Sequence, residues 1–167
     1  IALERIALAA RYRSGAWRIA HLSARAPEFG AASAAGTLSA QPPYAFELSG
    51  RVAARLPGSE PLPEVRWLAD GTLAEFALAA QALPPGSAVA QPARPLWIGL
   101  DTRVRPRAWP APQWLGPIVV SFDGVEPAQL GLRSAPRARL TGAATLRVEA
   151  DRVGGRLELR NALAGPI

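Results

Sequence analysis

The chain has no cysteine and no lysine, and its only histidine is His21. The absence of cysteine excludes disulfide bonds, cysteine-ligated zinc and thiol catalysis within this sequence. No apolar run approaches the roughly 20 residues that a membrane-spanning helix needs. Because lysine is absent, all 19 basic residues are arginines. This bias is typical of a GC-rich genome and says little about chemistry.

The formal net charge of the chain is +6, and a basic chain is a candidate for binding nucleic acid or anionic membranes. The arginines, however, are spread singly between Arg5 and Arg160 and alternate with apolar residues. That pattern is typical of the solvated face of a β-strand. We therefore expect no nucleic-acid partner.

Residues that could carry catalysis or bind a metal are sparse. His21 has Arg18 and Arg25 near it in the sequence but no acidic residue, so a solvated side chain is the simpler interpretation. The acidic residues stand mostly near arginines, which favours cross-strand ion pairs over a glycosidase-like pair of carboxylates. No GxGxxG motif, Walker motif or cluster of metal ligands is present. We expect a protein that is not an enzyme and has neither cofactor nor metal.

Strict alternation of apolar and polar residues dominates the sequence. In residues 44–56, Tyr44, Phe46, Leu48 and Val52 fall on one side of an extended chain, with Gly50 between them. Successive side chains of a strand point to opposite faces, so this segment is predicted to be a half-buried strand. Similar patterns predict further strands at residues 6–12, 17–22, 74–83, 96–104, 118–122, 140–150 and 156–160. Residues 31–35 and 74–83 contain good helix formers, but we expect both to be strands.

Glycine and proline mark the expected connections. Ser14-Gly15 and Gly154-Gly155 are predicted to be hairpin turns. The proline-rich residues 84–95 and 106–117 are expected to be loops or edge crossings, and 125–136 a loop or a short helical turn. Gly36-Thr37-Leu38 and Gly71-Thr72-Leu73 are 35 residues apart, with a looser copy at residues 142–146. We expect each copy to start a strand in a repeating β-meander.

These patterns predict an all-β fold, an elongated and twisted antiparallel sheet curled into a trough. The chain opens at Ile1 and stops at Ile167, just after Gly165-Pro166, and we expect residues 1–167 to be one sheet segment cut from a longer protein. A sheet with one apolar face has to fold over, pack on a second sheet or accept an apolar guest. A closed sandwich filled by its own side chains is therefore the alternative.

Three of the five tryptophans, Trp97, Trp109 and Trp114, lie in or beside proline-rich stretches. Exposed tryptophans serve as stacking platforms in carbohydrate-binding β-sandwiches, which makes such a module a further alternative. Packing at the sheet edge, or cation–π contact with arginines, is the simpler interpretation.

Several stretches resemble the TamB family of AsmA-like proteins. Residues 136–142 (PRARLTG) are similar to the P-x-x-x-L-x-G step of that family, and residues 156–167 (RLELRNALAGPI) resemble its L-x-L-x-N-x-x-x-G-P-I signature. Residues 103–106 and 108–110 resemble the V-x-P-F-x-x-W-P segment, without its phenylalanine. Residues 36–50 look like its G-x-L…Y-x-F-x-L-x-G strand pair.

The resemblance implies a periplasmic protein that is anchored in the inner membrane of a diderm bacterium and lacks an active site. Members of the family pair with an Omp85-type outer-membrane barrel called TamA, and they belong to the bridge-like lipid-transfer group. They are linked to phospholipid movement to the outer membrane and to outer-membrane protein assembly.

We therefore expect a hydrophobic groove that holds phospholipid acyl chains. A module that binds the strands of nascent outer-membrane β-barrel or autotransporter proteins is the second hypothesis. The residues expected to line the lipid groove are Tyr44, Phe46, Leu48, Val52, Leu96, Ile98, Leu100, Val104, Leu146, Val148, Leu157 and Leu159.

Overall fold

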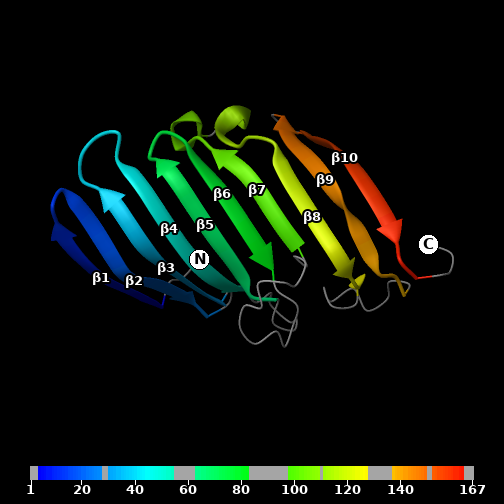
Figure 1. Ribbon diagram of the computed structural model, residues 1–167, viewed down its shortest axis with the longest axis horizontal. Helices are drawn as coiled ribbons and strands as arrows, with labels where there is room; N and C mark the ends of the chain where they lie inside the picture. Colours follow the sequence, from blue (N-terminus) through cyan, green and yellow to red (C-terminus); the bar gives the residue numbers. More distant parts are fainter. Residues whose placement is uncertain are drawn as a thin grey trace.

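A computed structural model describes residues 4–27, 30–54, 63–82, 98–109, 111–127, 137–149 and 152–163. These residues form ten β-strands and two short 3-10 helices (Figure 1). The strands are β1 (Arg5–Arg13), β2 (Ala16–Ala26), β3 (Gly30–Ser39), β4 (Ala45–Ala54), β5 (Val65–Thr72), β6 (Phe76–Ala82), β7 (Ile98–Val104), β8 (Ile118–Val125), β9 (Leu140–Glu149) and β10 (Arg152–Asn161). The 3-10 helices η1 (Pro106–Ala108) and η2 (Pro112–Trp114) lie between β7 and β8.

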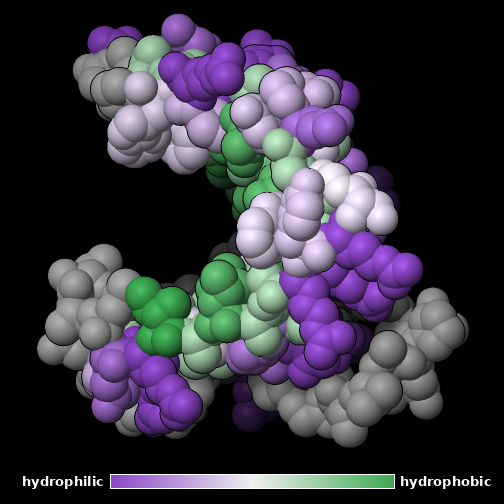
Figure 2. All heavy atoms as spheres, turned by 90° about the vertical axis from the view of Figure 1, so that its left-hand side faces the viewer, coloured by the Kyte–Doolittle hydropathy of each residue, from purple (hydrophilic) through white to green (hydrophobic). Residues whose placement is uncertain are grey.

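All ten strands belong to one sheet, and their order in the sheet is their order in the sequence. Every neighbouring pair is antiparallel, as in a simple meander. The predicted all-β, antiparallel fold is confirmed, and the described strands form no second sheet. The sheet is curved, and hydrophobic side chains gather in the hollow that Figure 2 shows on its inner side. Whether this hollow amounts to a trough stays a prediction.

The strand register separates the residues into two faces, because directly paired residues point to the same side of a sheet. One face, called the apolar face below, carries no charged residue in any described strand. It comprises Ile6, Leu8, Ala10, Tyr12, Trp17, Ile19, Leu22, Ala24, Ala26, Gly30, Ala32, Ala34, Gly36, Leu38, Phe46, Leu48, Gly50, Val52, Val65, Trp67, Ala69, Gly71, Phe76, Leu78, Ala80, Ala82, Ile98, Leu100, Thr102, Val104, Ile118, Val120, Phe122, Val125, Leu140, Gly142, Ala144, Leu146, Val148, Val153, Gly155, Leu157, Leu159 and Asn161. The opposite face, called the polar face, carries the charged residues of the strands.

A β-bulge in β2 keeps the apolar residues before and after it on the apolar face. Trp17 and Ile19 are odd-numbered, whereas Leu22 is even-numbered, so an unbroken strand would point them to opposite faces. The pairing shifts by one residue between Ile19 and Leu22, against both β1 and β3. An extra residue in one strand reverses the alternation beyond it. The bulge therefore returns Leu22 to the apolar face.

A second bulge has the same effect in β8. Phe122 pairs with Gly142 and Val125 pairs with Leu140, so one extra residue lies between them. Gly124 takes a positive φ of 61° there, and its N–H donates to Thr141 Oγ1 over 3.1 Å. Thr141 Oγ1 in turn donates to the Asp123 carboxylate over 2.8 Å. Strand β8 thus continues through Asp123-Gly124, where the predicted strand ended at Phe122.

The two predicted hairpin turns have different outcomes. Ser14 and Gly15 adopt positive φ angles of 52° and 79° and connect β1 to β2, so this prediction is confirmed. Gly154 and Gly155 do not form a turn, since they pair with Arg147 and Leu146 inside β10. A β-carbon on Gly155 would collide with the Thr145 carbonyl oxygen. Glycine marks a close backbone approach at this position rather than a reversal of the chain.

The expected repeat is also placed differently. The Gly36-Thr37-Leu38 copy ends β3, and Gly71-Thr72 ends β5, so neither starts a strand. Both glycines have positive φ angles, 149° and 141°. A β-carbon on either would approach the backbone of the next strand. The two copies share a backbone constraint at a strand end, which explains why the same residue type recurs there.

The segments with good helix formers, 31–35 and 74–83, lie largely in β3 and β6, so their assignment as strands is confirmed. The proline-rich residues 106–117 contain η1 and η2, so this connection is partly helical. The other proline-rich stretch, residues 84–95, lies outside the described residues, as do residues 128–136.

The fold has a sparse core. The buried apolar residues among those described are four alanines and two valines, and no large side chain is fully buried. Each strand packs mainly on its sheet neighbours, with η2 in addition against β9. A single layer buries each apolar side chain only against its own sheet, so the apolar face stays largely accessible.

Candidate functional site

The apolar face is the candidate site, and it contains nearly all of the predicted groove residues. Phe46, Leu48 and Val52 project from β4, Leu146 and Val148 from β9, and the others from β7 and β10 on the same side. Tyr44 precedes β4 and is partly exposed, with a positive φ of 57°. Leu96 lies outside the described residues.

Exposure of the apolar face increases toward the two edges of the sheet. In the central strands most of its large side chains are half-buried by their neighbours. At the edges, Leu8 of β1 is 64% exposed and Leu157 of β10 is 61% exposed. An edge strand has one neighbour instead of two, so less of each side chain is covered. Contiguous exposed apolar surface of this extent is typical of a site that meets an apolar partner.

Aromatic rings fill the gaps that glycines leave on this face. Phe46 and Phe76 both pair with Gly71, which lies between them on β5. Their rings meet edge to face with centroids 5.3 Å apart, a favourable arrangement for aromatic pairs. Because Gly71 has no side chain, the two rings can meet above it from the flanking strands.

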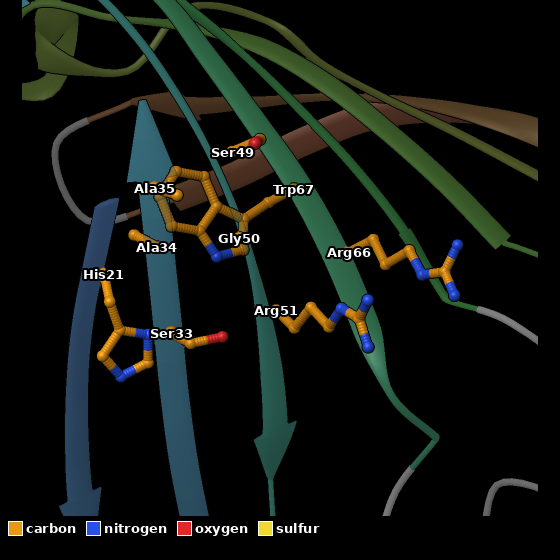
Figure 3. A pocket seen from close by; sticks show the side chains of 9 residues that line it. All are labelled: His21, Ser33, Ala34, Ala35, Ser49, Gly50, Arg51, Arg66 and Trp67. Atoms are coloured by element: carbon orange, nitrogen blue, oxygen red, sulfur yellow. The ribbon is translucent and has the colours of Figure 1, made fainter. Parts of the chain in front are cut away.

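Trp67 has a similar relation to Gly50, its partner on β4. Figure 3 shows the Trp67 side chain extending across β4 over Gly50 toward Ala34. These three residues line a shallow open pocket together with polar side chains that include His21, Ser33, Ser49, Arg51 and Arg66.

His21 lines two open pockets that also contain residues with catalytic potential. Ser33 and Ser49 share the first pocket with it, and Ser23, Ser33 and Glu64 share the second. Among the described residues His21 makes no hydrogen bond to any of these side chains, and Glu64 is paired with Arg51 and Arg66 instead. A nucleophilic serine needs a base that is itself oriented by a third group, and this arrangement supplies neither contact. The described residues also contain no group of three potential metal ligands.

The polar face carries ion pairs and several pairs of like charge. Glu75 accepts hydrogen bonds from Arg103 (3.1 Å) and Arg105 (2.8 Å). The bonds from Arg105 and then Arg103 hold the pKa of the Glu75 carboxyl below its ordinary value of 4.5. Arginines that are scattered in the sequence become direct cross-strand partners in three places: Arg5 with Arg25, Arg11 with Arg18, and Arg51 with Arg66.

The predicted set of groove residues omits more than half of the large residues on the apolar face. Strand β5 was not predicted, because Leu68 interrupts the polar positions of Arg66 and Asp70 and hides the alternation around Trp67. Residues of β2 were missed for another reason. The bulge changes the residues that face the apolar side from odd-numbered to even-numbered ones. Treating the residues before and after the bulge as two separate alternations would have assigned Trp17 and Leu22 to one face.

The tryptophans of the predicted stacking platform are arranged differently from what a platform requires. Trp109 and Trp114 pack against each other edge to face, with centroids 4.8 Å apart and planes at 79°. In a flat stacking platform the planes of the two indole rings would be parallel. Trp97 lies outside the described residues. Together with the single sheet, this geometry gives the carbohydrate-binding alternative no support.

None of the helices in the described parts of the chain has the length and hydropathy to cross a membrane. The chain matches no protein-family model, no curated protein and no solved structure.

Proposed function

We propose that this chain is a periplasmic segment of a TamB-like protein, in which the apolar face forms a groove for phospholipid transport between the inner and outer membranes. One observation carries the proposal: across ten strands the apolar face carries no charged residue and no second layer of described residues covers it. A soluble sheet with such a face needs an apolar guest or partner.

The dimensions of the sheet suit a guest with long hydrocarbon chains. Nine spacings of about 4.8 Å give the apolar face a width of roughly 43 Å across the strands. Acyl chains that lie across the strands would contact bulky side chains such as Leu48, Leu78, Leu100 and Leu146. The inner side of the curved sheet is hydrophobic and its outer side hydrophilic (Figure 2). With its acyl chains on the hydrophobic inner side, a bound phospholipid would keep its headgroup in water.

An open face also fits transport better than storage. Each fully buried methylene contributes about 0.8 kcal/mol. A chain that lies on one sheet is covered on one side only, so each methylene gains part of that amount. The described strands place no charged residue on the apolar face, so neighbouring positions have similar affinity for a methylene. Under these conditions an acyl chain is held but free to slide.

The experiment that tests the proposal is native mass spectrometry of the protein purified without detergent, followed by lipid extraction. We expect co-purified phospholipids with two acyl chains. An empty protein that also fails to take up fluorescent phospholipid from vesicles would contradict the proposal. The proposed membrane anchor and the proposed Omp85-type partner would be tested by sequencing the parent gene and its neighbours.

A second candidate function rests on the two edge strands of the described sheet. Strands β1 and β10 each have one neighbour in the sheet, so their outer backbone groups are available to pair with an added strand. Unfolded strands of outer-membrane β-barrel or autotransporter proteins are the clients that we propose for this mode. Photo-crosslinkers placed at outward positions in β1 and β10 should capture such clients. Crosslinks confined to positions on the apolar face, with lipid as the adduct, would favour the groove instead.

A further inference from the structure

The turn of the first hairpin, β1–β2, combines exposed aromatic rings with arginines that have no ion pair among the described residues. Tyr12 and Trp17 are direct cross-strand partners next to the Ser14-Gly15 turn. Their rings lie with centroids 5.3 Å apart, at 57% and 43% exposure. The Ala40 N–H donates to the Gly15 carbonyl oxygen over 2.8 Å. This bond ties the tip to the connection between β3 and β4 and limits its movement.

The polar face of this hairpin is strongly cationic. Arg5, Arg11 and Arg13 project from β1, and Arg18 and Arg25 from β2. Neither strand contains an acidic residue. The nearest one, Glu4, lies 3.6 Å from Arg25 at the end remote from the turn. The hairpin is therefore amphipathic, with arginines on one side and Ile6, Leu8 and the aromatic pair on the other.

The Arg11–Arg18 pair has no structural explanation within the sheet. Like charges directly opposite each other destabilise a strand pair. Where Arg51 faces Arg66, Glu64 lies between them, 3.8 Å and 3.6 Å away. Arg11 and Arg18 have no such carboxylate among the described residues. The nearest acid along their row, Glu47, is two strands away from Arg18, beyond Thr37. Repulsion that the fold does not relieve can be relieved by an external anion.

We propose that the tip of the β1–β2 hairpin is a membrane-docking element that binds the interface of a bilayer rich in anionic phospholipid. Tyrosine and tryptophan prefer the headgroup region, because their rings are apolar and their N–H or O–H groups stay hydrated. Arginines next to the rings meet the lipid phosphates. The exposed apolar side chains of the hairpin favour insertion into a lipid interface. An acidic protein or a nucleic acid would bind the arginines but would leave these apolar side chains in water.

The same end of the sheet repeats this chemistry at a second place. Helices η1 and η2 lie at the end where the β1–β2 turn also lies (Figure 1). Trp109, which directly follows η1, packs on Trp114 of η2, and Arg107 lies in η1. Arg105 precedes them but is engaged by Glu75. This second group gives the sheet end additional interfacial contacts, while the hairpin tip supplies the unpaired charge.

The test is co-sedimentation of the whole chain with vesicles of phosphatidylcholine alone or mixed with phosphatidylglycerol. We expect binding to the mixed vesicles only. The variant R11Q/R18Q should lower the partition coefficient roughly 30-fold, because each arginine near an anionic surface contributes about fivefold. R11K/R18K should retain most of the binding. Y12S/W17S should weaken binding to the same vesicles by removing the rings from the interface.

Matched controls come from parts of the sheet away from the hairpin and the groove. R156Q/R160Q changes the net charge by the same amount on the polar face of β10. L68S/V119S removes exposed apolar side chains from the polar face of β5 and β8. Both should bind as the unmodified chain does. Circular dichroism checks the fold, and R11Q/R18Q should be at least as stable as the parent because it removes a repulsion.

Three results would overturn the proposal. The first is equal binding to neutral and anionic vesicles, and the second is an equal loss in R156Q/R160Q. The third is that double-stranded DNA displaces the vesicles and that its binding depends on Arg11 and Arg18 to the same extent. That result would identify a polyanion as the partner. Lipid retained on the apolar face is measured separately, so docking can fail while the groove proposal stands.

Discussion

The indole ring of Trp67 lies over the backbone of Gly50, its cross-strand partner. A β-carbon at Gly50 would come within 2.7 Å of two atoms of that ring, and it would also collide with the Ser33 carbonyl oxygen. Glycine weakens a strand because it contributes no side chain to pack. The indole ring of the next strand supplies that missing contact, so the two residues form one packing unit on the apolar face.

We predict that removing either member of this unit destabilises the sheet. Trp67→Ala should lower the free energy of unfolding by about 2 kcal/mol, below the 3–5 kcal/mol typical of fully buried tryptophans, since Trp67 is half-buried. Gly50→Ala should cost about 2 kcal/mol or more through the two collisions. Urea unfolding followed by circular dichroism measures both. Leu68→Ala, on the polar face of the same strand, is the control and should change stability by less than about 1 kcal/mol.

A charge in the middle of the apolar face should abolish lipid retention. Leu100→Arg places a guanidinium between Ala80 and Val120, where acyl chains would lie. Val119→Arg adds the same charge on the polar face, opposite Asp101. We expect the first variant to purify with little phospholipid and the second with a normal amount. Equal lipid content in two folded variants would rule out the apolar face as the binding site.

The corrected position of the last hairpin predicts opposite effects for two adjacent glycines. A β-carbon at Gly154 meets no atom within 4 Å, whereas one at Gly155 collides with the Thr145 carbonyl. Gly154→Thr should therefore stabilise β10 by about 0.5–1 kcal/mol through its higher strand propensity. Gly155→Thr should destabilise it. If these residues formed a tight turn, Gly154→Thr would be destabilising too, and thermal unfolding distinguishes the two outcomes.

The Glu75 cluster predicts a pH dependence of stability. The folded-state pKa of Glu75 is lowered by its hydrogen bonds to Arg105 and Arg103. Because this pKa is lowered on folding, the Glu75 carboxylate stabilises the fold at any pH above its pKa in the unfolded chain. This stabilisation disappears as the pH falls through its pKa in the folded protein. Glu75→Gln should therefore be less stable than the parent at neutral pH and equally stable in strong acid. The difference should be small, because the cluster is exposed to solvent and salt screens it.

The double substitution R103Q/R105Q provides an independent check on that cluster. It leaves Glu75 in place but removes both hydrogen-bond donors. The pH-dependent part of the stability should be lost to the same extent as in Glu75→Gln. A pH dependence that persists in R103Q/R105Q would show that other carboxylates cause it.

The local alternation in the sequence was sufficient to predict most of the strands. Strands β1, β4, β7 and β9 were predicted because apolar residues recur at every second position, and this period is a property of the extended backbone alone. The alanine-rich β3 and β6 were also assigned correctly. In β6 the alternation of Phe76 and Leu78 with Ala77 and Ala79 outweighs the helix propensity of alanine. The same reasoning assigned the groove residues of β4, β7, β9 and β10 to one face.

The sequence by itself determined that the strands have two different sides. Apolar residues occupy every second position, and arginines and acidic residues occupy the positions between them. Tertiary structure alone decided which residues of different strands lie opposite each other. The register depends on bulges and on backbone contacts at Gly36, Gly71 and Gly155, which involve residues far apart in the sequence. For that reason the bulge in β2, the Trp67–Gly50 unit and the opposed Arg11 and Arg18 became visible only when neighbouring strands were placed side by side.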